Sequence, residues 1–250
     1  MREIGVIATT KIQTNKTMSK FLSIILLITL LISIGLNIKL LSENKTFEET
    51  AKLCTTKQSA TDWYHQHLAY ANNRDTSSAE LCLSIAAQLG HAEAQCKLGR
   101  IHLDRGDEKL AETWMSEAAK QGNAEHQYQL GRCYDYVYTW ESDEEKAQFS
   151  RLAFSWYEKS ATQNHAAAAK FLAQCYRVGR GCEKDLSAAE YWYKKAAELG
   201  EYVNRGLAEV YIETGRPELA MPLLSAEAAA GSSQARTILN NLNAGKSDSH

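Results

Sequence analysis

The sequence predicts an all-α protein, an α-solenoid of antiparallel helix pairs preceded by one transmembrane helix. Three observations carry this prediction. Residues 21–41 form a long apolar run, a string of small residues ending in glycine returns every 31 to 42 residues, and the chain has only two prolines. So few prolines, together with 14 glycines in 250 residues, argue against a loop-rich all-β protein.

The apolar run contains no charged residue from Phe21 to Ile38, and Lys39-Leu40-Leu41 extends it. Twenty-one helical residues span about 31 Å, which is roughly the thickness of one bilayer hydrocarbon core. A buried core helix would show a polar face. Here the polar interruptions are confined to Ser23, Thr29, Ser33 and Asn37. We therefore expect a transmembrane helix at residues 21–41.

The flanks of this helix favour a retained signal anchor with a cytoplasmic N-terminus. The run is longer than that of a cleaved signal peptide, and residues 39–45 offer no small-x-small cleavage site. Basic residues before a span favour the cytoplasmic side, and here they are Arg2, Lys11, Lys16 and Lys20. The sequence thus predicts a cytoplasmic basic tail (1–20), a linker (42–61) and a periplasmic or other extracytoplasmic repeat domain. A true start at Met18 would weaken this orientation.

Beyond the linker the chain repeats itself. A string of two small residues, two spacers and a final glycine or asparagine ends at positions 90, 122, 164, 200 and 231, so the spacings are 32, 42, 36 and 31 residues. A second motif, a leucine followed by a small residue, recurs with a similar spacing as Leu98-Gly99, Leu130-Gly131, Leu172-Ala173 and Leu207-Ala208. Two independent marks with one period indicate structural repeats.

Each period is predicted to form two helices. In the second helix, small and aromatic residues recur in pairs four apart, as in Leu110, Ala111, Trp114, Met115, Ala118 and Ala119. The alanines of this face allow a neighbouring backbone to come close. Gly99 and Gly131 are expected to serve the same close approach in the first helix. The glycines at 90, 122 and 200 stand where a helix end needs a left-handed residue.

These strings resemble the Sel1-like repeat, a relative of the tetratricopeptide repeat. The best copy runs from Leu172 to Gly200 and includes a Gly179-x-Gly181 loop, with Cys182 where valine is usual and Ala173 in place of glycine. The resemblance covers residues 62–242, and weaker outer copies suit terminal repeats that cap an exposed face. The tail at 243–250 is predicted to be disordered.

The resemblance implies a right-handed superhelix whose first helices line the concave side, the usual binding surface in such arrays. Positions three before, one after or four after the Leu-Gly glycine should face it. The predicted partner-binding residues are Arg100, Arg132, Tyr128, Lys170, Gln174, Arg177 and Arg205. Five of the twelve such positions are basic and two are acidic, which indicates a mildly basic groove for an acidic segment. The alternative is that these charges only solvate a helix surface.

An insertion stretches one period to 42 residues and contributes three surplus aromatic residues, Tyr136, Tyr138 and Trp140. An exposed aromatic loop would suit a partner-binding hot spot. Equally, the loop could fold back over the helix that follows it. The next residues, Ser142 to Glu145, have the pattern of a capping box at the start of a helix.

Six cysteines follow the apolar run. Outside the cytoplasm they would be free to form disulfides, and Cys82 and Cys96, which flank the turn at residue 90, are the candidate pair. Buried free thiols are the alternative. The chain has no catalytic or phosphate-binding motif, and His65-x-His67 has no third metal ligand at a recognised spacing.

We therefore expect no enzymatic activity, no metal, no cofactor, no nucleic acid and no small-molecule substrate. The predicted function is a membrane-anchored interaction module, an adaptor or scaffold that binds a protein or peptide partner, with an acidic segment favoured. One alternative is a periplasmic immunity or inhibitor protein that blocks a toxin or hydrolase. Another is a binder of an envelope polymer, or an enzyme acting on it.

Overall fold

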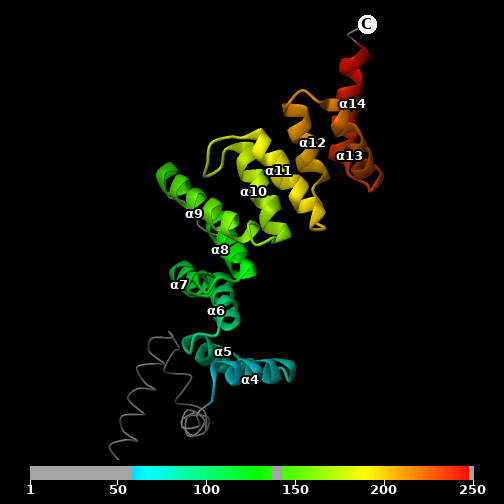
Figure 1. Ribbon diagram of the computed structural model, residues 1–250. Coiled ribbons are helices and arrows are strands. Elements are labelled where there is room, and N and C mark those ends of the chain that lie inside the picture. The colour runs from blue at the N-terminus through cyan, green and yellow to red at the C-terminus, as the bar shows by residue number, and fades with distance from the viewer. Residues whose placement is uncertain (1–57, 137–141, 248–250) are drawn as a thin grey trace, which may run out of the picture. The chain divides into compact units, whose positions relative to one another are not determined.

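The computed structural model describes residues 58–136 and 142–247 of the chain. This part of the chain is all-α, with eleven helices and no strand (Figure 1). The helices are α4 (Ala60–Asn72), α5 (Thr76–Gln88), α6 (Ala92–Asp104), α7 (Glu108–Lys120), α8 (Ala124–Tyr136), α9 (Asp143–Ala161), α10 (Ala166–Val178), α11 (Leu186–Glu198), α12 (Asn204–Glu213), α13 (Pro217–Ala229) and α14 (Ser233–Ser247). The chain divides into two compact units between Ser84 and Ile85.

The described part of the first unit contains α4 and the larger part of α5. A capping box starts α4, since the Ser59 hydroxyl accepts from the Asp62 amide while the Asp62 carboxylate accepts from the Ser59 amide. Nδ1 of His67 lies 2.8 Å from the carbonyl oxygen of Ala79, which ties α4 to α5. Among the described residues no group of three metal-binding side chains occurs, and His67 is engaged in this helix contact.

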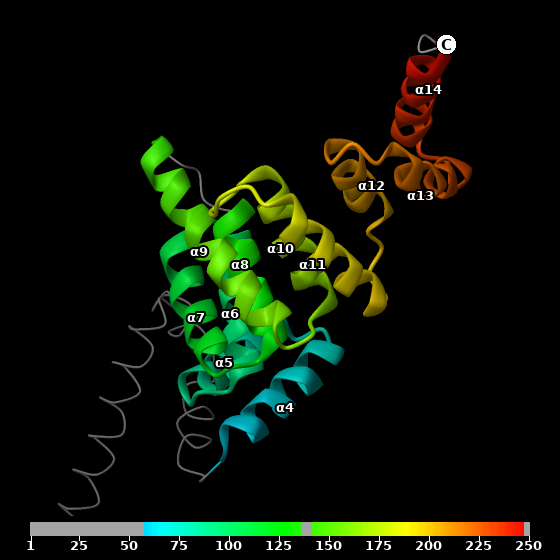
Figure 2. The ribbon, with the colours of Figure 1, turned by 45° about the horizontal axis from the view of Figure 1, so that its top comes forward.

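In the second unit each helix from α6 to α14 packs against the next one along the chain, and α6 also contacts α8 (Figure 2). We call α6, α8, α10 and α12 the first helices, and α7, α9, α11 and α13 the second helices. The surface carried by the first helices is the first-helix face. This arrangement confirms the predicted solenoid of helix pairs, in which each pair contacts only its neighbours.

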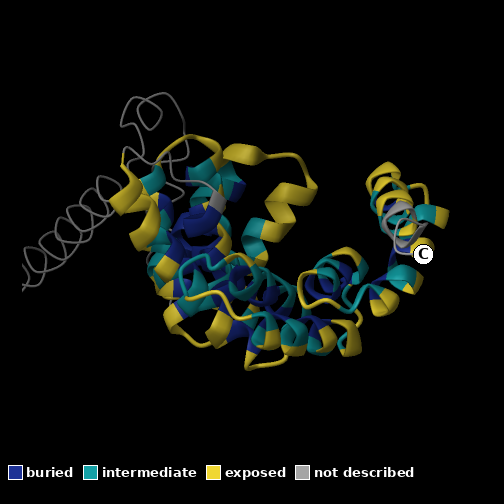
Figure 3. Cartoon of the chain, turned by 90° about the horizontal axis from the view of Figure 1, so that it is seen from above, coloured by how far each residue is buried: buried dark blue, intermediate teal, exposed yellow. Residues whose placement is uncertain are grey.

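The pairs are held together where a small residue of the first helix meets a large residue of the second. A Cβ added to Gly99 would overlap the side chain of Met115, and one added to Gly131 would overlap the ring of Tyr157. In Figure 3 the buried segments, in dark blue, lie where neighbouring helices of this unit face one another. The close approach predicted for Gly99 and Gly131 is therefore confirmed.

The turns that close the repeats also follow the prediction. Gly90, Gly122 and Gly200 have φ angles of +90°, +92° and +90°, in the region that a left-handed helix end requires. Asn164 stands in the degenerate copy and has a φ of +62°, which asparagine tolerates better than most residues. The same backbone turn is thus made in successive repeats in spite of this substitution.

The Gly179-x-Gly181 loop locks α10 to the preceding pair. Gly181 has a φ of +74°, and a Cβ added there would overlap the backbone carbonyl of Ser150 in α9. Between the two glycines, the Arg180 guanidinium lies 3.0 Å from the carboxylate of Asp135 in α8. Burial raises the pKa of Asp135 although Arg180 opposes the shift, and Asp135 is 5% exposed. Asp135 lies four residues after Gly131, one of the positions expected to face a partner, but it is a buried partner of this loop.

Polar pairs near the N-terminal ends of the first helices connect one repeat to the next. Nε2 of His126 lies 3.0 Å from the carboxylate of Glu93, and Nε2 of His165 lies 2.8 Å from that of Glu125. Each pair joins a first helix to a residue at the start of the next first helix. The successive first helices are therefore linked by side chains as well as by packing.

Two predicted segments fall outside or at the edge of the described residues. Residues 21–41, expected to span a membrane, lie outside them, and within 58–136 and 142–247 no helix is long and apolar enough to cross a membrane. At the C-terminus, helix α14 (Ser233–Ser247) extends into the segment 243–250 that was expected to be disordered, and residues 248–250 lie outside the described residues.

Because Gly181 lies against the Ser150 carbonyl, even a methyl group at position 181 should lower the free energy of unfolding considerably. Gly181→Ala must adopt a left-handed backbone and also push against the Ser150 carbonyl, so we expect a loss of about 3 kcal/mol in the free energy of unfolding. Urea denaturation followed by circular dichroism measures it.

Gly122→Ala is the matched control, because Gly122 has a φ of +92° but no atom within 4 Å of an added Cβ. It should lose only about 1 kcal/mol, the cost of the backbone conformation alone. Equal losses in the two variants would contradict the close contact between the loop and α9.

Candidate functional site

Among the described residues of the second unit, a pair of recesses lies on the first-helix face, each between consecutive first helices. One, the α6–α8 pocket, has a volume of about 330 Å³ and is lined by Arg100, Leu103, Asp104, Met115, Gln129, Arg132 and Cys133. The other, the α10–α12 pocket, has a volume of about 380 Å³ and is lined by Lys170, Gln174, Arg177, Tyr193, Tyr202, Val203, Arg205, Gly206, Glu209 and Glu227. Both recesses contain residues that the repeat register predicted for partner binding.

The α6–α8 pocket brings Arg100 and Arg132 together. Each is exposed, and each follows the Leu-Gly mark of its repeat by one position. The guanidinium of Arg132 lies 5.9 Å from the ring centroid of Tyr128, a distance at which a cation–π attraction holds the side chain. Asp104 contributes one acidic group to the lining, so the basic residues are in excess in this pocket.

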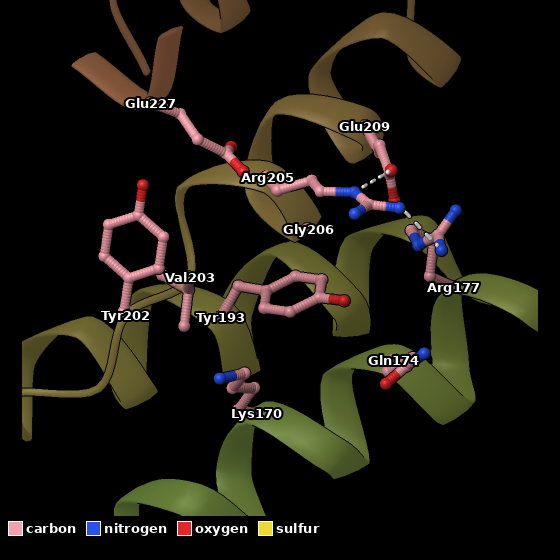
Figure 4. Close-up of a pocket in the computed structure, with 10 residues that line it drawn as sticks. All are labelled: Lys170, Gln174, Arg177, Tyr193, Tyr202, Val203, Arg205, Gly206, Glu209 and Glu227. Atoms are coloured by element: carbon pink, nitrogen blue, oxygen red, sulfur yellow. Dashed lines mark hydrogen bonds and ion pairs between the residues drawn. The ribbon is translucent and has the colours of Figure 1, made fainter. Parts of the chain in front are cut away.

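The α10–α12 pocket gathers four predicted residues, Lys170, Gln174, Arg177 and Arg205 (Figure 4). Its bases, however, are already paired with acids. Arg177 lies 3.0 Å from the carboxylate of Glu209 and 3.1 Å from that of Glu213, and Lys170 lies 2.7 Å from Glu201. Nε of Arg205 lies 3.1 Å from Oε1 of Glu209, the carboxylate oxygen that Arg177 does not contact. Lys170 and Arg177 thus serve contacts between repeats, whereas Arg205 and Glu209 pair within α12.

The electrostatics agree with this pairing. Burial alone would lower the pKa of Arg177, but the carboxylates of Glu209 and Glu213 outweigh it and raise that pKa. The pKa of Glu213 is lowered, chiefly by its hydrogen bond from Lys184 and also by Arg177. Each group therefore stabilises the charged form of the other. In this half of the face the bases of the expected mildly basic groove are paired with acids of the chain.

The sequence spacing of the acidic partners also indicates these ion pairs. Glu201, Glu209 and Glu213 follow their basic partners Lys170 and Arg177 by 31, 32 and 36 residues, which is one repeat length. A search for opposite charges one repeat apart would have found these pairs. The prediction counted charges along the face and omitted the pairing between neighbours.

Tyr128 was predicted to face the partner, but the structure places it in the core, 8% exposed. Its ring stacks on His165, with centroids 4.9 Å apart, and lies 5.7 Å from the ring of Phe171. These contacts come from the next repeat, so Tyr128 joins α8 to α10. We leave it out of the candidate surface because little of its side chain is accessible.

The aromatic insertion lies largely outside the described residues. Tyr136 is the last residue of α8, and Tyr138 and Trp140 belong to residues 137–141, which the structure does not describe. The following helix starts as predicted, with the Ser142 hydroxyl accepting from the Glu145 amide at 3.2 Å. A binding role for the three aromatic residues stays a prediction.

Cys82 and Cys96 are free, buried thiols in the structure. Burial raises the pKa of each thiol to about 11, with the acids Asp75 and Glu93 adding to the effect. A thiol with so high a pKa is a poor nucleophile near neutral pH. A disulfide between them stays a prediction that depends on the compartment.

Comparisons with known proteins match the architecture. The Sel1 repeat family model matches residues 92–123, 124–165 and 166–201. A Sel1 repeat protein from Oxalobacter formigenes is 25% identical over 71% of this chain and 74% of that one, with a TM-score of 0.55. A comparison with curated proteins finds no match.

Two further solved structures resemble the chain less closely. A protective antigen of uropathogenic Escherichia coli with an SLR fold is 22% identical over 75% of this chain and 49% of that one, with a TM-score of 0.44. The C-terminal part of a TPR repeat-containing protein from Cytophaga hutchinsonii is 17% identical over 76% and 77%, with a TM-score of 0.49. The Sel1 repeat model thus matches residues 92–201 in three successive copies, and the described all-α solenoid resembles the fold of a Sel1 repeat protein.

Proposed function

We propose that this chain is a membrane-anchored interaction module that holds a protein or peptide partner on its first-helix face. Sel1 and TPR-like repeats generally mediate protein–protein interaction, since stacked repeats create extended binding surfaces. The observation that carries the proposal is the position of the two recesses. Both lie between consecutive first helices, along the face from which the repeat register predicts binding.

The size of the recesses favours side chains of a partner over an enclosed small molecule. Volumes of about 330 and 380 Å³ stand at the lower end of the range for small-molecule sites, and both recesses are open. Two such hollows on one face suit a segment whose side chains enter each in turn. A polypeptide with anchoring residues at separate positions meets this requirement.

The α6–α8 pocket supplies the charge that favours an acidic residue of the partner. Arg100 and Arg132 are exposed there, and arginine forms paired hydrogen bonds with a carboxylate. The α10–α12 pocket does not add to this attraction, since the partners of its bases are acids of the chain itself. An acidic group of the partner is therefore assigned to the α6–α8 end of the face.

Charge reversal tests this assignment. In Arg100→Glu/Arg132→Glu, a stoichiometric partner isolated with the unmodified chain from its own cells should bind at least about tenfold more weakly, because attraction becomes repulsion. Binding of the purified partner by calorimetry measures the change. Arg177 is unsuitable for this test, since a glutamate there would face Glu209 and Glu213 and destabilise the repeats.

Lys109→Glu/Lys120→Glu is the matched control, because it changes the net charge equally and both lysines are exposed on the second helix α7. This variant should retain full affinity. If both double variants bound the partner equally weakly, the effect would be one of net charge. Unchanged affinity in Arg100→Glu/Arg132→Glu would show that the α6–α8 pocket does not bind the partner.

The anchor in this proposal is the apolar run at 21–41, with the N-terminus in the cytoplasm and the repeats in the periplasm or another extracytoplasmic space. Its support is the uncharged stretch long enough for a bilayer and the basic residues that precede it. A reporter fused after His250 tests the orientation. Alkaline phosphatase should be active there and a green fluorescent protein dark, whereas the reverse result would place the repeats in the cytoplasm.

A further inference from the structure

The α10–α12 pocket contains an acid that nothing in the described chain neutralises. Glu227 projects from α13 into the lining, and its Oε2 atom is buried without a hydrogen-bond partner among the described residues. A carboxylate oxygen removed from water and left without a donor costs free energy, so native proteins rarely keep one unless something else satisfies it. A donor brought by a bound molecule would remove this cost.

The other charges of the pocket do not meet this need. Lys170 is paired with Glu201, and both Arg177 and Arg205 are held by Glu209. Figure 4 shows the two arginines and Glu209 at one side of the pocket, with Arg205 extended away from Glu227. The acid of Glu227 is therefore the charge of this pocket that lacks a counter-ion among the described residues.

Tyr202 also lines this pocket. Its side chain is 56% exposed, and Figure 4 shows its hydroxyl directed toward the side of the pocket where Glu227 lies. An exposed aromatic ring in the same pocket as a carboxylate favours a cation, because the ring face attracts positive charge and its apolar surface covers an aliphatic stem. An acidic ligand group would instead meet repulsion from Glu227.

We propose that the α10–α12 pocket is a subsite for a basic side chain, lysine or arginine, of the bound polypeptide segment. The carboxylate of Glu227 accepts from the ammonium or guanidinium group, and Tyr202 covers the stem. This inference rests on the proposed function and sharpens it. The first-helix face then selects a segment with an acidic residue for the α6–α8 pocket and a basic residue for the α10–α12 pocket.

The test uses the full-length chain in an uncharged detergent and three acetylated, amidated pentapeptides. Their central residue is lysine, Nε-acetyl-lysine or glutamate, and the flanking residues are alanine. The lysine peptide should shift the backbone amide signals of Tyr202 and Gly206 in nuclear magnetic resonance spectra in a saturable way. Glu227→Gln, which keeps the shape and removes the charge, should weaken this binding about tenfold.

Glu218→Gln is the control, since Glu218 is an exposed acid of the same helix outside the pocket lining. The affinity of this variant for the lysine peptide should equal that of the unmodified chain.

Glu227→Gln should also unfold at the same or a higher urea concentration than the unmodified chain, since no partner of the side chain is lost. A clear fall would show that Glu227 supports the fold. Equal binding of the lysine and acetyl-lysine peptides, or no effect of Glu227→Gln, would overturn the subsite. Charge reversal at Arg100 and Arg132 tests the proposed function separately. The proposed function and the basic subsite can therefore be contradicted independently.

Discussion

The close approach of the two helices within each pair is the contact on which the rest of this solenoid depends. It occurs where a residue with little or no side chain in the first helix lies under a large residue of the second, as with Gly99 under Met115 and Gly131 under Tyr157. In the next two pairs, Ala173 and Ala208 hold the same register position and are fully buried. Since successive residues of a helix are about 100° apart, fixing this position inside also fixes which residues face outward. The exposure of Arg100 and Arg132, one residue further on, follows from it.

This register explains how much of the fold could be predicted from the sequence. Glycines and alanines mark the contacts between backbones, and glycine or asparagine marks each left-handed turn, so the repeats were visible as a period. The lengths of the three matched Sel1 repeats, residues 92–123, 124–165 and 166–201, agree with the 32, 42 and 36 residue spacings of the sequence. Local steric requirements of this kind restrict the residue type at a position, so they can be recognised in the sequence.

The charges of the candidate site were harder to predict, because their effect depends on side chains from the neighbouring repeat. Arg177 has the position expected for a binding residue, yet two carboxylates of α12 hold it. Tyr128 also has the expected position, but the aromatic residues of the next repeat cover it. Glu227 has no place in the register of the first helices, since it belongs to a second helix and enters the pocket from the following pair. Register along one helix could not show any of these three outcomes.

Charge is therefore distributed unevenly along one face of the solenoid. Its α6–α8 end has exposed arginines, whereas the bases near α10 and α12 are used to join repeats and leave one acid unsatisfied. Such a pattern would fix the direction in which an elongated partner lies, because each end of the face rejects the charge that the other accepts.

The claim that the first-helix face binds the partner is tested most directly by photo-cross-linking in the cells that make the protein. A photoreactive phenylalanine derivative would replace Gln129 or Gln174, which line the two pockets, or the exposed second-helix residues Glu117 and Lys194. The account predicts that one partner is cross-linked from Gln129 and Gln174 and from neither second-helix position. Cross-links to that partner from Glu117 and Lys194, with none from the pockets, would contradict it.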